Sequence, residues 1–171
     1  MHRSILSILL SVFALALPKA LEAAPRAELF VGYQYSRIGG VVNANGWNAS
    51  LTGNVNRWLG ITADFSGAYK SSGGLGANAL TYAFGPTFSM RGERVSPFVH
   101  ALFGGFRASA GFAGASASTN GFTAIAGGGV DAKATSRITV RAIQVDWILW
   151  RTQGLTEEKN VRICTGIVFR F

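Results

Sequence analysis

Apolar and polar residues alternate along most of the chain after residue 24, with a period of two rather than the helical period of 3.6. In residues 47–56 every odd position is apolar or glycine, and every even position is Asn, Ser or Thr. Such alternation is typical of a β-strand with two different faces. No segment after residue 24 is apolar for the 18 or more residues that a transmembrane helix needs.

The alternation predicts eight strands, with boundaries good to two or three residues. They are placed at 27–37, 47–56, 59–70, 79–91, 97–109, 121–134, 138–150 and 160–171. The seventh strand needs a one-residue slip near Ala142-Ile143, a β-bulge, because Arg141, Gln144 and Asp146 must share its polar face. Short turns are expected at 56–58, 92–96 and 135–137. Longer loops, rich in Gly, Ser, Ala and Asn, are expected at 38–46, 71–78, 110–120 and 151–159.

The apolar face carries no Asp, Glu, Lys or Arg in any predicted strand. A soluble lipocalin-like barrel would scatter charges over its outer face, whereas a charge facing lipid at mid-bilayer costs roughly 2–4 kcal/mol. The fold class is therefore all-β, an eight-stranded antiparallel up-and-down transmembrane β-barrel with both termini on the periplasmic side. Ten aromatic residues near predicted strand ends suit interfacial girdles. They are Tyr33, Tyr35, Trp47, Trp58, Tyr69, Tyr82, Phe88, Phe98, Trp147 and Trp150.

The polar face predicts a lumen charge network. Its members are Glu28, Asp64, Arg107, Asp131, Arg141, Asp146, Arg162 and Arg170, with Lys70, Arg91 and Lys133 on the same face. Asp131 and Arg141 are expected to pair across the 135–137 turn. Glu28 and Arg170 are expected to meet where the first and last strands close the barrel.

The N-terminus predicts a cleaved signal peptide, residues 1–23, before a barrel domain at 24–171. Met1-His2-Arg3 gives a positive start, Ser4–Leu17 is apolar, and Ala23/Ala24 offers small residues for cleavage. The apolar run is too short for a membrane anchor, which needs roughly 20 residues.

Composition excludes several function classes. The formal net charge is +8, but the basic residues are spread singly, so no nucleic-acid partner is expected. Cys164 is the single cysteine and no Cys/His cluster has metal-ligand spacing, so neither a disulfide, a metal nor a cofactor is expected. The 22 glycines exceed the roughly 12 of average usage, as strands with bends and close backbone approach require. Within the sixth strand, Gly127-Gly128-Gly129 is expected to allow a bend.

The chain end alternates to a terminal Phe171, and residues 166–171 resemble the C-terminal signal that the barrel-assembly machinery recognises. Residues 84–89 and 97–100 also resemble segments of outer-membrane protein A-like barrels. The resemblance covers residues 27–171 and implies insertion into outer-membrane lipid by that machinery, with Gly166, Phe169 and Phe171 as the assembly signal. The sequence shows no counterpart of the peptidoglycan-binding domain of multidomain members, so no peptidoglycan role is implied.

Three functions remain open at this point. The first is a structural or interaction barrel that displays its external loops to a partner the sequence does not identify. The second is a conduit for a small solute or apolar ligand. The third is a lipid-modifying enzyme, which needs a nucleophile and a base within reach of each other. Because His100 is the only histidine after the leader and Cys164 has no evident base, no catalytic residue is expected.

Overall fold

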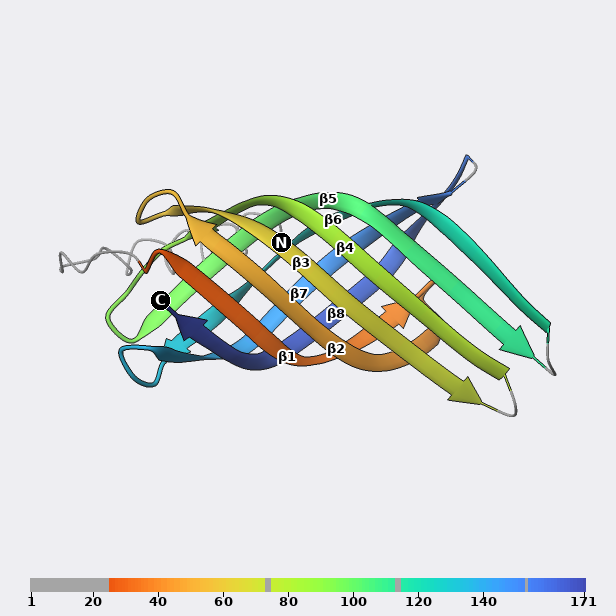
Figure 1. Cartoon of the computed structure of the whole chain (residues 1–171), viewed down its shortest axis with the longest axis horizontal. Coiled ribbons are helices and arrows are strands. Elements are labelled where there is room, and N and C mark those ends of the chain that lie inside the picture. The colour runs from red at the N-terminus through yellow and green to blue at the C-terminus, as the bar shows by residue number, and fades with distance from the viewer. Residues whose placement is uncertain (1–24, 73–74, 113–114, 153) are drawn as a thin grey trace, which may run out of the picture.

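The computed structural model describes residues 25–72, 75–112, 115–152 and 154–171. They form one closed barrel of eight antiparallel strands in sequence order (Figure 1). The strands are β1 (Ala27–Ile38), β2 (Val42–Asn54), β3 (Leu59–Ser72), β4 (Leu75–Ser89), β5 (Val95–Phe112), β6 (Ala115–Lys133), β7 (Ile138–Thr152) and β8 (Leu155–Arg170). The predicted fold class and strand number are confirmed. The predicted signal peptide lies outside the described residues.

Neighbouring strands pair without any crossover, and β1 pairs with β8 to close the ladder. The β2–β3, β4–β5 and β6–β7 connections lie at one end of the barrel with the start of β1 and the end of β8, and we call this the turn end (Figure 1). The opposite end, where β1–β2, β3–β4, β5–β6 and β7–β8 connect, is the hairpin end. No helix in the described part of the chain is long and apolar enough to cross a membrane.

The predicted β-bulge in the seventh strand is confirmed. The β7–β8 register shifts between Arg141 and Gln144, and both intervening residues, Ala142 and Ile143, are exposed. The extra residue lets Arg141 and Gln144 both face the lumen although they are three positions apart.

The expectation of long loops at the hairpin end is wrong. The β1–β2 connection spans only residues 39–41, and β5 and β6 pair as far as Phe112 and Ala115. Gly39 and Gly40 supply the positive φ angles that this tight β1–β2 turn requires. The small polar residues expected to form loops instead continue the ladder, because backbone pairing does not depend on an apolar side chain.

The two faces of the barrel differ as the alternation predicts. Large apolar side chains on the outer face remain about half exposed, as Leu51 (52%) and Phe84 (51%) illustrate. Exposed aromatic residues on this face contact one another at several depths of the barrel. Trp47 donates to the Tyr69 hydroxyl (3.3 Å) in the hairpin half, and Trp58 stacks on Phe88 (centroids 5.8 Å apart) beside the turn end. The inner face is buried and largely polar.

Candidate functional site

Arg162 of β8 lies at the centre of the lumen and is 1% exposed. Its Nε and Nη2 lie 2.8 and 2.7 Å from Asp146 Oδ2 on β7. Its Nη1 donates to Asp64 Oδ1 on β3 (2.9 Å) and to Ser66 Oγ (3.0 Å). Since β1 and β2 separate β8 from β3, this planar group with five donors ties strands together across the interior.

Both carboxylates bound by Arg162 have further partners. Asp64 Oδ2 accepts from Asn48 Nδ2 (2.9 Å), and Asp146 Oδ2 accepts from Gln144 Nε2 (2.7 Å). His100 Nε2 lies 2.9 Å from Asp146 Oδ1, which shows that this histidine faces the lumen. A fully buried charge is tolerated only when it is paired and hydrogen-bonded, and these groups meet both conditions.

Gly127 makes room for the contact between His100 and Asp146. It is the register partner of both residues, on β5 and β7 respectively. A Cβ atom at this position would collide with the Asp146 carboxylate. The glycine run therefore supplies space inside the barrel at this point.

Arg141 forms a second layer, nearer the turn end. Its Nε and Nη2 donate to Asp131 Oδ1 (2.8 Å) and Oδ2 (3.1 Å), and its Nη1 donates to Gln144 Oε1 (2.7 Å). The guanidinium carbon also lies 4.4 Å from the ring centroid of Phe30 and 4.2 Å from that of Phe98. Arg141 is thus held between two rings in cation–π contact, and Gln144 connects it to the central layer.

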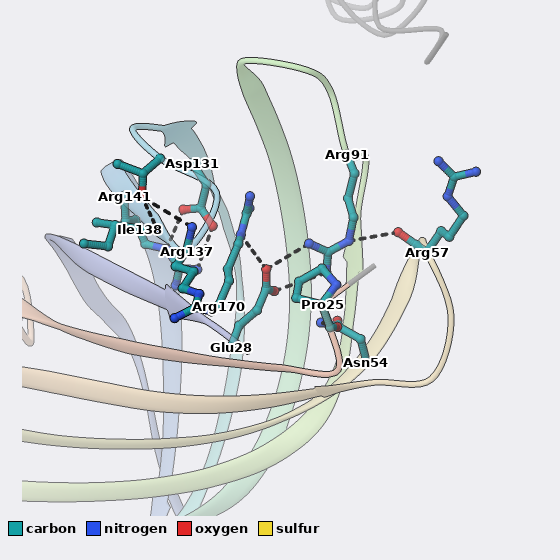
Figure 2. Close-up of polar contacts among 11 residues, drawn as sticks. Pro25, Glu28, Asn54, Arg57, Arg91, Asp131, Arg137, Ile138, Arg141 and Arg170 are labelled. Atoms are coloured by element: carbon teal, nitrogen blue, oxygen red, sulfur yellow. Dashed lines mark hydrogen bonds and ion pairs between the residues drawn. The ribbon is translucent and has the colours of Figure 1, made fainter. Parts of the chain in front are cut away.

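Glu28 forms the third layer, at the turn end (Figure 2). Arg91 Nη1 and Nη2 donate to its two oxygens (2.8 and 3.2 Å), and Arg170 Nε donates to Oε1 (2.9 Å). Glu28 and Arg170 are register partners across the β1–β8 closure, the position the sequence predicts. Arg91 also donates to the carbonyl of Arg57 (3.2 Å), which fixes this layer to the β2–β3 turn.

An apolar layer fills the lumen on the hairpin side of Arg162. Its buried members are Ala83, Leu102, Ile125 and Ile148. Phe106 and Trp150 stack against each other there, with ring centroids 4.6 Å apart. A cavity of about 20 Å³ between Gln34, Trp150 and Arg162 has room for a water-sized molecule.

The placement of Arg107 in the lumen is wrong. Arg107 is exposed on the outer face, and its neighbour Phe106 takes the inward position. The prediction placed every charge inside, but at this depth the ring of Phe106 stacks on Trp150 and fills the lumen. Lys70 is also exposed, near the end of β3.

Two residues assigned to the aromatic girdles point inward instead. Phe98 is 6% exposed and packs on Arg141, while Trp150 packs against the apolar layer. The other eight aromatic residues of that set lie exposed on the outer face. Alternation separates the faces of a strand, but an aromatic ring suits either face, so hydropathy alone did not separate these two from the rest.

The residues of the expected assembly signal lie on β8 and at its end. Phe169 is 38% exposed on the outer face, and Phe171 is 71% exposed. Gly166 faces Gly32 of β1, its register partner, at the barrel closure.

The buried carboxylates and the histidine of the described lumen are engaged in pairs. Within the described ranges, no three His, Cys, Asp or Glu side chains gather as metal ligands. Cys164 is buried in an apolar cluster with Phe30 and Val168. The one histidine there is hydrogen-bonded to a carboxylate that Arg162 already binds.

Small outer-membrane barrels are among the solved structures that this chain resembles. Ail, the attachment invasion locus protein of Yersinia pestis, matches with a TM-score of 0.62 and 16% identity over 86% of this chain and 99% of its own. Neisserial surface protein A matches with a TM-score of 0.67 and 11% identity (85% and 96% covered). The N-terminal barrel domain of Pseudomonas aeruginosa OprF matches with a TM-score of 0.63 and 10% identity (88% and 100% covered).

The fold is that of the small outer-membrane β-barrels. The resemblance to outer-membrane protein A-like barrels is thereby confirmed at the level of fold. The sequence matches no protein-family model and no curated protein. Sequence identities of 10–16% show that this chain shares the fold of these barrels. The roles of its lumen residues follow from their own contacts.

Proposed function

We propose that the protein is an integral outer-membrane β-barrel with a closed lumen and a structural or interaction role. The observation that carries the proposal is the outer surface, a closed ladder covered by half-exposed residues such as Ile61, Phe65, Phe103, Val145 and Ile163. A continuous apolar surface of this kind is unstable in water, whereas a bilayer both covers it and demands a ladder without edges. The outer-membrane fold of the structural neighbours supports the location.

The conduit alternative is disfavoured by the contents of the lumen. A solute would have to pass the Glu28 layer, the ring-bound Arg141, the Arg162 bridge and the apolar layer in turn. Each layer joins strands on different sides of the barrel or fills the space between them. An eight-stranded barrel has an interior that side chains can fill, and here they do so.

The lipid-modifying enzyme alternative would have to use His100 or Cys164, and neither is accessible to lipid in the described structure. Lipid reaches only the outer face, while His100 is 7% exposed and turned toward Asp146. Cys164 is 1% exposed on the inner face. Neither side chain is placed to act on a lipid at the barrel surface.

Membrane fractionation, detergent extraction, gel migration and conductance measurements test the proposed function. The protein should sediment with outer membranes, need detergent for extraction and migrate differently on gels before and after heating. In planar bilayers the wild-type barrel should show no steady conductance. A water-soluble monomer would contradict membrane insertion, and large stable currents would favour the conduit.

The hairpin end favours one kind of interaction partner. It carries five basic residues (Arg37, Lys70, Arg107, Arg151, Lys159) against two acidic ones (Glu157, Glu158), a net of 5 − 2 = +3. One structure of Ail contains the heparin analogue sucrose octasulfate. We therefore propose a sulfated or otherwise polyanionic external ligand. Titration of the barrel with sucrose octasulfate should give saturable binding that the double variant Arg107→Gln/Arg151→Gln weakens, and unchanged binding would refute this.

A further inference from the structure

Every turn at the turn end carries an exposed arginine next to an outward-facing apolar residue. Arg57 precedes Trp58 in the β2–β3 turn, Arg94 precedes Val95 after the β4–β5 turn, and Arg137 precedes Ile138 after the β6–β7 turn. These apolar partners are 57%, 49% and 38% exposed, respectively. We call Arg57, Arg94 and Arg137 the arginine collar. Figure 2 shows the Arg57 side chain extending away from the Glu28 layer.

The acidic groups of this end are largely engaged inside the barrel. Glu28 accepts from Arg91 and Arg170, and Asp131 accepts from Arg141. In the described ranges the turn end holds eight basic residues and three acidic ones, a net of 8 − 3 = +5. The basic residues are Arg26, Arg57, Arg91, Arg94, Lys133, Arg137, Arg141 and Arg170, and the acidic ones are Glu28, Glu93 and Asp131.

The collar is distributed around the barrel rather than gathered on one side. Its members follow β2, β4 and β6 in a closed barrel whose strands run in sequence order, so they stand at every second strand junction. A single acidic protein would contact one side of such a ring. Lipid, in contrast, surrounds a membrane-spanning barrel on all sides. Its phosphates lie just beyond the acyl region, toward which Trp58, Val95 and Ile138 point.

The backbone fixes two of the three positions. The Asn56 side chain accepts from the amides of Trp58 and Leu59 (2.9 and 2.8 Å), and the Thr135 hydroxyl accepts from those of Arg137 and Ile138 (3.3 and 3.0 Å). Trp58 is also stacked on Phe88. The turn backbone that carries Arg57 and Arg137 is therefore held in place by side-chain hydrogen bonds.

We propose that the arginine collar binds the phosphate groups of anionic phospholipids in the leaflet that surrounds the turn end. This inference rests on the proposed function, since it requires the barrel to span a membrane. The adjacent apolar residue enters the acyl region while the guanidinium group stays at headgroup level and donates to phosphate oxygens. Basic residues at an anionic lipid surface contribute additively, so three of them should enrich these lipids measurably.

The test uses Trp58 as a local reporter in the full-length mature barrel, inserted into phosphatidylcholine vesicles. Trp47 and Trp147, the other outward-facing tryptophans, are replaced by Phe, while Trp150 faces the lumen and remains. Quenching of Trp58 by brominated phosphatidylglycerol is compared with quenching by brominated phosphatidylcholine at equal mole fraction. We expect a ratio of about 2 at low salt, falling toward about 1 in concentrated salt, because screening weakens exposed charges.

The triple variant Arg57→Gln/Arg94→Gln/Arg137→Gln should abolish this preference. The matched control Arg37→Gln/Arg107→Gln/Arg151→Gln removes the same charge at the hairpin end and should keep the wild-type ratio. Heat-modifiable migration shows separately that each variant is inserted and folded. A folded wild-type barrel with equal quenching by both lipids would overturn the collar and leave the proposed function standing. Binding of polyglutamate through the same three arginines, without lipid preference, would also overturn it and identify an acidic polymer as the partner.

Discussion

Replacing Arg162 by Met should lower the free energy of unfolding by about 3–5 kcal/mol, the usual effect of removing one partner from a buried ion pair. The structure favours the upper part of this range. Asp64 and Asp146, which are 1% and 0% exposed, would both remain buried without their shared cation. Their remaining partners are Asn48 for Asp64, and Gln144 and His100 for Asp146, and none of these is an arginine or a lysine.

The measurement is urea-induced unfolding of the barrel in detergent micelles or vesicles, followed by tryptophan fluorescence and by gel migration. Arg107→Met is the matched control, because it removes the same group from an exposed position and should change stability by less than about 1 kcal/mol. The triple variant Asp64→Asn/Asp146→Asn/Arg162→Met removes all three charges and should recover most of the loss. Equal effects of Arg162→Met and Arg107→Met would refute the bridge as a stabilising element.

Two further outcomes follow from the packing and from the proposed assembly signal. Gly127→Val should destabilise the barrel by at least about 2 kcal/mol in the same unfolding assay, because its side chain would displace Asp146, whereas Gly53→Val meets no atom within 4 Å and should be tolerated. Deleting Phe171, or replacing it by Asp, should reduce the heat-modifiable protein recovered in outer-membrane fractions, since we propose that the barrel-assembly machinery reads this exposed terminal ring. Wild-type recovery of both Phe171 variants would contradict that role.

The sequence predicts features that follow from which residues share one face of a strand and which strands are neighbours. Because Arg141 and Gln144 are three positions apart and both polar, their joint burial required a bulge, and the structure contains it. The pairing of Asp131 with Arg141 followed from the length of a single turn, and the pairing of Glu28 with Arg170 from closure of the barrel. Each of these inferences involves strands that are neighbours in the ladder.

Contacts across the lumen could not be predicted in the same way. Asp64 and Arg162 are 98 positions apart, on strands that share no hydrogen-bond ladder. The alternation places both residues inside, but their heights in the barrel depend on the register of every intervening strand pair. The prediction that Arg107 rather than Phe106 points inward was wrong for another reason. Which of the two points inward depends on whether the lumen at that depth is polar or apolar, and alternation does not show this.

Several glycines lie where the backbone of a neighbouring strand and an aromatic ring together leave no room for a Cβ atom. A Cβ atom at Gly32, Gly129 or Gly166 would meet a backbone carbonyl oxygen of the neighbouring strand first. It would also meet a ring atom, of Phe30 at Gly32 and Gly166 and of Phe98 at Gly129. Small residues beside large ones let rings fit inside a narrow barrel. An aromatic ring over a neighbouring glycine also covers backbone that a strand would otherwise expose.

This packing bears on whether the lumen could open during function. Arg141 lies between Phe30 and Phe98, and both rings are seated over glycines, so neither ring can move aside without meeting the wall. Moving Arg141 alone would break its contacts with Asp131 and Gln144 and would expose a buried carboxylate. Opening a path would therefore require the two rings to move and the Arg141–Asp131 ion pair to break at the same time. The closely packed barrel wall leaves no space into which these groups could move.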